Sequence, residues 1–191
     1  MKPWLSRSRI LALVVLTAAA VGAGVLSRNS LSPNPPVPRL VPLAESLGAV
    51  TVTAKDGTKV DLTALKGKTV VLHFWATWCP PCVDEMPGLV AYARELAGDP
   101  NVQLVTVSVD DSFDIVNAFL EKHGGSDLPV LLDAKREAAG RFGTLKFPET
   151  YVISPDGTIV TLVQGAMRWE SPEVRKQLAA WIRKAAAKQE S

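Results

Sequence analysis

The stretch that decides the fold is Val70-Val71-Leu72-His73-Phe74-Trp75-Ala76-Thr77-Trp78-Cys79-Pro80-Pro81-Cys82. Its first half is an apolar run with the length of a buried strand, and the segment after Cys82 carries apolar residues at helical spacing. The only two cysteines of the chain therefore fall on a strand-to-helix turn. A cysteine at a helix N-terminus meets the positive end of the helix dipole, which favours its thiolate, and a second cysteine one turn on can resolve a mixed disulfide. The pair is predicted to be a redox dithiol.

The N-terminus is typical of a membrane-targeting segment. Residues 1–9 contain three basic side chains and no acid, and residues 10–26 contain no charge. We expect a cytoplasmic basic region over 1–9 and a membrane anchor over 10–26, with a cleaved signal segment as the alternative. Because the basic end stays inside, the rest of a single-pass protein would lie on the periplasmic or extracytoplasmic side of the cytoplasmic membrane. After cleavage it would be secreted.

A proline-rich linker is predicted to separate this segment from one folded domain. Residues 27–42 contain five prolines, which favours an extended chain, and residues 43–191 suffice for a single domain with its own core. From Glu45 onward the chain has sixteen basic and nineteen acidic side chains, so the overall charge of +2 belongs to the N-terminal tail. No basic cluster recurs in the domain, and we expect no nucleic-acid partner.

The hydrophobic pattern of the domain predicts an α/β fold with a central mixed sheet flanked by helices. Because strand, helix and strand follow one another from Val70 to Val109, those two strands should be parallel with a right-handed crossover. Turn signals predict antiparallel hairpins at both ends of the domain. The expected elements are hairpins over 50–62 and 151–163, strands over 70–75, 102–109 and 129–132, and helices from Pro80, over about 115–124, over 134–142 and after Ser171 as N-cap.

These elements and two short stretches resemble a known family. The Phe74–Cys82 stretch and Phe147-Pro148-Glu149-Thr150 are similar to the thioredoxin superfamily, specifically to TlpA/ResA/DsbE-like membrane-anchored thiol-disulfide oxidoreductases. The resemblance spans essentially the whole domain, including the N-terminal β-hairpin and a helix-strand insertion at about 112–132. It implies a thioredoxin-like fold, an extracytoplasmic location and reduction of disulfides in client proteins, with apocytochrome c in cytochrome c maturation as one candidate client. It implies no cofactor beyond the redox-active Cys79–Cys82 disulfide, and no metal.

The resemblance also implies roles for single residues. Cys79 matches the attacking cysteine, Cys82 the resolving one, and Glu85 an acidic residue thought to handle protons near the thiols. Pro148 matches a cis-proline beside the dithiol, where the backbone of Phe147 would pair with an extended client peptide. The predicted client-binding residues are Trp78, Pro80, Pro81, Phe147, Pro148 and Glu149, the last one through its charge.

Three positions, His73, Glu85 and Glu149, have more than one possible role. His73 departs from the family pattern, which has a buried aspartate or an asparagine there, so it is either a hydrogen-bonded core histidine or part of the proton path. Glu85 has a plain electrostatic role near the helix N-terminus as its alternative. For Glu149, the alternative to client selection is that the side chain has no functional role.

Pro80 and Pro81 bear on the direction of the reaction. If Cys79 is the N-cap, the next two residues lack an N–H, so few donors can support its sulfur. Weak thiolate stabilisation accompanies reductants near about −270 mV rather than oxidants near about −120 mV, so we expect a reductant, with a dithiol oxidase or isomerase as the alternative. A reductant on the outer face must be recharged, which predicts a membrane electron donor of the DsbD/CcdA type. A thiol peroxidase and a copper metallochaperone are less favoured alternatives.

Overall fold

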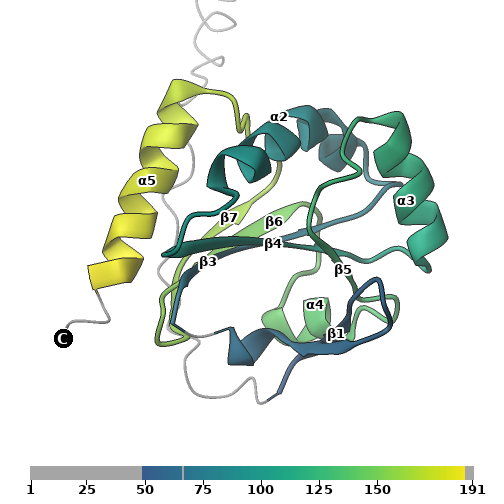
Figure 1. Cartoon of the computed structure of the whole chain (residues 1–191), viewed down its shortest axis with the longest axis horizontal. Coiled ribbons are helices and arrows are strands. Elements are labelled where there is room, and N and C mark those ends of the chain that lie inside the picture. Colours follow the sequence, from purple (N-terminus) through teal and green to yellow (C-terminus); the bar gives the residue numbers. More distant parts are fainter. Residues whose placement is uncertain (1–48, 66, 188–191) are drawn as a thin grey trace, which may run out of the picture. The chain divides into compact units, whose positions relative to one another are not determined.

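A seven-stranded mixed sheet with helices on both faces forms the domain (Figure 1). The structure is a computed structural model and describes residues 49–65 and 67–187. The predicted basic region, membrane segment and linker, residues 1–42, lie outside the described residues. Within the described part of the chain, no helix is both long enough and apolar enough to span a membrane.

The sheet has the strand order β2-β1-β5-β4-β3-β6-β7. β3 lies between β4, to which it is parallel, and β6, to which it is antiparallel. This confirms the predicted parallel pair, and the two predicted hairpins appear as β1–β2 and β6–β7. The strands are β1 (Thr51–Thr53), β2 (Lys59–Asp61), β3 (Thr69–Trp75), β4 (Val102–Ser108), β5 (Val130–Leu132), β6 (Glu149–Ile153) and β7 (Ile159–Gln164).

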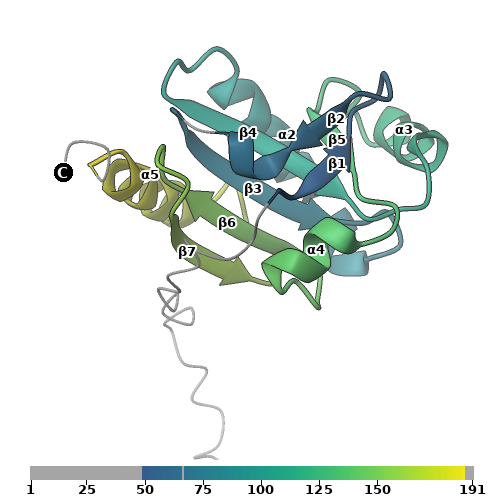
Figure 2. The ribbon, with the colours of Figure 1, turned by 90° about the horizontal axis from the view of Figure 1, so that it is seen from below.

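The helices cover opposite faces of the sheet. Side chains alternate along β3, so that Trp75 contacts Phe119 of α3 (Phe113–Lys122) on one face while Phe74 contacts Phe142 of α4 (Glu137–Phe142) on the other. Figures 1 and 2 show α4 across the sheet from α2 and α3. The helical elements are the short 3₁₀ helix η1 (Leu62–Ala64), α2 (Pro80–Leu96), α3 (Phe113–Lys122), α4 (Glu137–Phe142) and α5 (Pro172–Ala186).

The packing of α2 on β3 fixes the turn that carries the cysteines. All seven residues of β3 are buried, as are Cys82, Met86 and Leu89 on the inner face of α2. Burial of each large apolar side chain contributes about 1.5–3 kcal/mol, so this contact holds the N-terminus of α2 firmly at the end of β3.

One helix start and one helix cap differ from the sequence-based expectation. α4 begins at Glu137 rather than at residue 134, because Arg136 adopts a left-handed conformation with φ of 57° and its N–H closes a turn on the carbonyl of Asp133. Ser171 occupies the N-cap of α5 as expected, but its hydroxyl donates to the Glu173 carboxylate rather than accepting from the helix backbone. The predicted insertion is α3 and β5, and β5 extends the sheet by pairing with both β4 and β1.

Candidate active site

The two cysteines lie at the N-terminus of α2 and are joined by a disulfide. Cys79 is the N-cap in an extended conformation, and its Cα lies 5.3 Å from that of Cys82. Cys79 keeps 5% of its surface exposed whereas Cys82 keeps none. Only Cys79 therefore faces solvent, as an attacking cysteine must.

The first turn of α2 offers no backbone donor to the Cys79 sulfur. Pro80 and Pro81 have no N–H, and the N–H groups of Cys82 and Val83 both donate to the carbonyl oxygen of Cys79, at 3.0 and 3.1 Å. The sulfur instead lies 3.5 Å from the carbonyl oxygen of Phe147. Once the disulfide is reduced, a carbonyl oxygen at this position could accept a hydrogen bond from a thiol but would repel a thiolate.

The Phe147–Pro148 peptide bond is cis and lies beside the dithiol. Pro148 is buried, and the ring of Phe147 meets that of Trp78 at 5.9 Å in an edge-to-face arrangement. The structure therefore brings the two segments of the family resemblance, 74–82 and 147–150, into contact across the active site.

Exposed apolar side chains lie in the two segments that meet at this point. Trp78 is 53% exposed and Leu145, two residues before Phe147, is 85% exposed. We name the set Trp78, Pro80, Pro81, Leu145 and Phe147 the apolar rim. The guanidinium carbon of Arg136 lies 5.1 Å from the centre of the Trp78 ring, a cation–π contact that steadies this exposed indole.

Glu85 lies one turn beyond Cys82 and is 6% exposed. Its Oε2 accepts hydrogen bonds from the N–H of Met167 at 2.7 Å and from Nε1 of Trp169 at 2.9 Å. A surface acid that merely complements the helix dipole would sit in the first turn and in water. The buried position and the two donors instead give Glu85 a defined place under the dithiol helix.

His73 is fully buried on β3 and joins β6 to α2. Its Nδ1 lies 2.9 Å from the hydroxyl of Thr150, and its Nε2 lies 3.2 Å from Oε1 of Glu85. Its ring also meets that of Trp169 edge-on at 5.5 Å. The sequence singled out both His73 and Glu85 but gave no reason to pair them.

Glu149 does not reach the surface where a client would dock. It is 1% exposed, and its carboxylate accepts from Nε2 of Gln164 at 2.8 Å and from the hydroxyl of Tyr151 at 3.1 Å. The alternation of β6 turns this side chain to the interior, on the face opposite Thr150. The position corrects the expectation that its charge selects clients. Burial also raises the pKa of Tyr151 above its ordinary value.

Asp110 is a site residue that the sequence reasoning missed. Its carboxylate accepts from the N–H of Thr77 at 3.0 Å, from the hydroxyl of Thr77 at 2.7 Å and from the hydroxyl of Ser108 at 2.7 Å. It thereby anchors the loop that leads into Trp78 and Cys79. One sequence signal could have identified Asp110. It is an acidic residue just after the apolar strand β4, whose carboxyl end lies beside that of β3.

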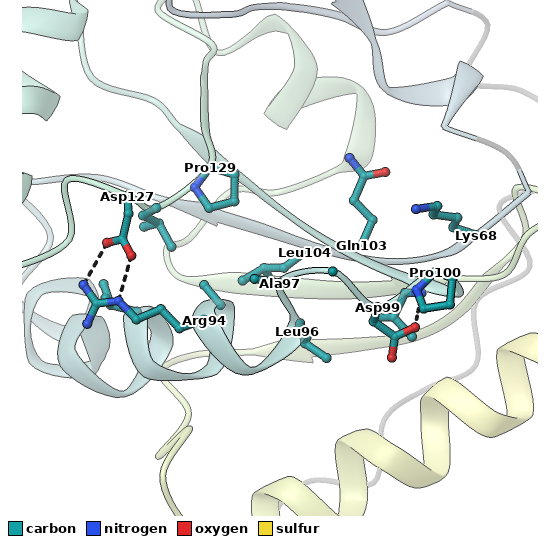
Figure 3. Close-up of a pocket in the computed structure, with 15 residues that line it drawn as sticks. Lys68, Arg94, Leu96, Ala97, Asp99, Pro100, Gln103, Leu104, Asp127 and Pro129 are labelled. Carbon is teal, nitrogen blue, oxygen red and sulfur yellow. Dashed lines mark hydrogen bonds and ion pairs between the residues drawn. The ribbon is translucent and has the colours of Figure 1, made fainter.

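A groove of about 450 Å³ lies at the other end of α2, away from the cysteines (Figure 3). Its apolar lining includes Val90, Leu96, Leu104 and Pro129. Arg94 and Asp127 close one side through a hydrogen-bonded ion pair, with Nε and Oδ2 2.7 Å apart, which lowers the pKa of Asp127. Among the described residues, no group of three or more His, Cys, Asp or Glu side chains is arranged to hold a metal ion.

Comparison with known proteins agrees with the fold and with the dithiol. The AhpC/TSA family matches residues 44–162. The thiol-disulfide oxidoreductase ResA of Bacillus subtilis is 35% identical over 112 residues, which cover 59% of this chain and 62% of that protein. ResA of Bacillus thuringiensis is 32% identical over 136 residues, which cover 70% of this chain and 72% of that protein.

A solved structure gives the same result in three dimensions. A secreted disulfide oxidoreductase of Mycobacterium tuberculosis, homologous to E. coli DsbE, superimposes with a TM-score of 0.58. The match has 28% sequence identity and covers 72% of this chain and 99% of the other. Together with the Cys79–Cys82 disulfide at the helix N-terminus, these similarities show that the chain belongs to the AhpC/TSA family and is a thioredoxin-like thiol-disulfide oxidoreductase of the ResA/DsbE type.

Proposed function

We propose that this protein reduces disulfides in client proteins outside the cytoplasm. The Cys79 thiolate attacks one sulfur of a client disulfide, forming a Cys79–client bond, and the departing client thiolate takes a proton from water. Cys82 then loses its proton and attacks the Cys79 sulfur, which releases the second client thiolate, and this thiolate also takes a proton from water. The client gains two electrons and two protons in total, and the protein is left with the Cys79–Cys82 disulfide.

The observation that carries the proposed direction is the absence of donors around the Cys79 sulfur. Within the first turn of α2, the prolines have no N–H and the next two amides are occupied by the Cys79 carbonyl. The facing oxygen of Phe147 also disfavours negative charge on the sulfur. An oxidant depends on a strongly stabilised reduced form, and the first turn of α2 supplies no free N–H donor to stabilise it here.

Glu85 is the proposed acceptor of the proton that Cys82 must lose. Residues three apart on a helix are neighbours on one face, and both of these side chains are buried toward the sheet. Oε1 of Glu85 makes no hydrogen bond within the described residues, which leaves it available to receive a proton.

The apolar rim is the proposed client surface. Exposed apolar side chains next to a reactive pair mark a site that meets another protein. The backbone of Phe147, beside the Cys79 sulfur, would pair with an extended client peptide, while Trp78 and Leu145 would contact its side chains.

The N-terminal sequence supports the proposed location. Residues 10–26 would anchor the protein in the cytoplasmic membrane and residues 27–42 would hold the domain away from the bilayer. A membrane electron donor of the DsbD/CcdA type would recharge the dithiol, and apocytochrome c is a proposed client.

Trapping a mixed disulfide tests the roles of the two cysteines. In cells that produce the full-length protein, the Cys82→Ser variant should accumulate client proteins bound through Cys79, since the resolving thiol is missing. The Cys79→Ser variant should trap none. Trapping by Cys79→Ser alone would reverse the assignment, and hydrogen peroxide consumption by the wild type at rates comparable to disulfide reduction would favour a thiol peroxidase.

A further inference from the structure

Two buried titratable side chains, His73 on β3 and Glu85 on α2, face each other beneath the dithiol. Nε2 and Oε1 are 3.2 Å apart, and the side chains of both residues are almost entirely excluded from water. Within the described residues neither atom makes a hydrogen bond of standard geometry. The polar atom that faces Nε2 is therefore Oε1, and the one that faces Oε1 is Nε2. Burial of an unpaired carboxylate costs several kcal/mol, which makes an isolated Glu85 charge here unfavourable without the imidazole.

The other atoms of the two side chains are held in place. Oε2 of Glu85 accepts two N–H donors, from Met167 and Trp169, so it cannot itself carry a proton without losing one of them. A proton arriving at this carboxyl group must therefore go to Oε1, the oxygen that faces His73. Gly88 lets the Trp169 segment approach, because a Cβ there would lie 3.2 Å from the Cβ of Trp169.

Thr150 allows His73 to change its protonation without moving. Its hydroxyl lies 2.9 Å from Nδ1, and the two residues are register partners between β3 and β6. A hydroxyl can donate to a bare ring nitrogen or accept from a protonated one. The imidazole can thus be neutral, with its N–H on Nδ1 donating to Thr150 and a bare Nε2 able to share a proton that arrives at Oε1, or doubly protonated, with Nδ1–H still donating to Thr150 and Nε2–H to Glu85.

We propose that His73 is a positioning residue of the exchange reaction, forming with Glu85 one proton-accepting couple that serves Cys82. This inference rests on the proposed role of Glu85 but not on the direction of electron flow. In the step concerned, the Cys82 S–H bond breaks, the proton passes to the couple at Oε1, and the Cys82 sulfur keeps the electron pair. The couple changes from a net charge of −1 to zero as the sulfur changes from zero to −1, so the total buried charge is constant.

Few other charged groups lie around the couple. On α2, the ring of Tyr92 packs at a tilt against that of Trp169, and burial raises the pKa of the Tyr92 hydroxyl. On α5, Arg175 donates to the Trp169 carbonyl and pairs with Glu95 at the exposed edge. Glu149 of β6 lies on the opposite face of the sheet from Thr150 and is bonded to Gln164 and Tyr151. Among the described residues, none of these groups faces Oε1 of Glu85 as His73 does.

Histidine NMR on the full-length wild-type protein in detergent tests the couple directly. The chain has only two histidines, so ¹³C labelling of histidine gives one signal from His73 and one from His123. His123 stacks on Phe119 at the end of α3 and serves as the internal reference. We expect the pH response of His73 to differ between the oxidised and reduced protein, and this difference to vanish in Glu85→Gln. An identical response of His73 in both redox states would overturn the proposal.

A kinetic test separates proton transfer from packing. Reduced protein mixed with dithiobis(nitrobenzoate) releases one thionitrobenzoate when Cys79 attacks and a second when Cys82 resolves the mixed disulfide. His73→Gln should slow the second release by at least about tenfold at pH 7 and alter its pH profile, while the first release is unchanged. Glu85→Gln should do the same, and the double variant should be no slower than either. His123→Gln is the matched control and should behave as wild type.

The outcomes distinguish failure of the proposed His73 role from failure of the proposed resolving role of Cys82. If the wild type shows no second release, resolution by Cys82 itself fails. If both releases occur and His73→Gln keeps the wild-type pH profile, or if the two single effects multiply in the double variant, only the role of His73 is wrong. The NMR result on the wild type decides the matter even if His73→Gln does not fold.

Discussion

Asp110 holds Thr77 by two hydrogen bonds, one from the Thr77 N–H at 3.0 Å and one from its hydroxyl at 2.7 Å. Thr77 immediately precedes the exposed Trp78 and the attacking Cys79. The carboxylate at the end of β4 therefore fixes the path of the active-site loop at the end of β3.

Removing that carboxylate should loosen the loop. Each hydrogen bond to a charged group contributes about 1.5–3 kcal/mol, so we expect loss of the two bonds to Thr77 in Asp110→Ala to lower the free energy of unfolding by about 3–6 kcal/mol and to slow disulfide reduction. Urea unfolding of the reduced protein measures the first effect. The exposed neighbour Asp111 provides the control, since Asp111→Ala should change stability by less than about 0.5 kcal/mol. Equal effects of the two variants would show that the Thr77 contacts are unimportant.

Glu85 should matter for stability as well as for proton transfer. Glu85→Ala leaves the N–H of Met167 and Nε1 of Trp169 without their acceptor and the imidazole of His73 without its facing carboxylate, and loss of one partner from a buried pair costs about 3–5 kcal/mol. We expect a loss of that size by chemical unfolding. The exposed Asp84 one position earlier is the control, and Asp84→Ala should be nearly neutral. A near-neutral Glu85→Ala would contradict the buried network.

Tyr151 should make the protein sensitive to alkaline pH. Burial raises the pKa of Tyr151 in the folded state above the value of 10.0 expected for an exposed tyrosine. Above pH 10 the unfolded chain then binds fewer protons than the folded one, so the free energy of unfolding falls as pH rises, by up to about 1.4 kcal/mol per pH unit for this group.

The Tyr151→Phe variant isolates this contribution. Its stability at pH 7 should drop because the hydroxyl bonds to Thr144 and Phe142 are lost, but its slope between pH 10 and pH 11 should be shallower than that of the wild type. Lysine titration affects both proteins alike and cancels in the comparison. Identical slopes would mean that Tyr151 ionises freely in the folded state.

Leu145 should contribute to client recognition without contributing to the fold. It is 85% exposed, so Leu145→Ser should leave the unfolding free energy within about 0.5 kcal/mol of wild type. We expect a several-fold loss in kcat/KM with an unfolded disulfide protein as client and no change with oxidised glutathione, which is too small to span the apolar rim. An equal loss with both substrates would indicate damage to the dithiol rather than to a client surface.

The sequence predicted most of the fold because its local signals agreed with the tertiary structure. The apolar run before Cys79 became β3, and the turn signals at 55–58 and 154–157 became the two hairpins. The start of α4 was not predicted because Arg136 adopts a left-handed conformation. An arginine within a helical pattern gives no sign of that conformation.

The site was predictable along the chain but not across it. The two cysteines follow from a short stretch and the cis-proline from the family resemblance, whereas the contacts of Asp110 with Thr77 and of His73 with Glu85 join residues on different elements. The resemblance predicts that the charge of Glu149 selects clients, and only the register of β6 with β3 and the burial of the side chain show that it turns inward.

The central claim, that this protein is a reductant, is tested most directly by the equilibrium reduction potential of the Cys79–Cys82 pair in the full-length protein, measured against glutathione or dithiothreitol buffers. The donor-poor helix N-terminus and the facing Phe147 carbonyl predict a value towards about −270 mV. A value towards about −120 mV would contradict the account and make the protein an oxidant of its clients.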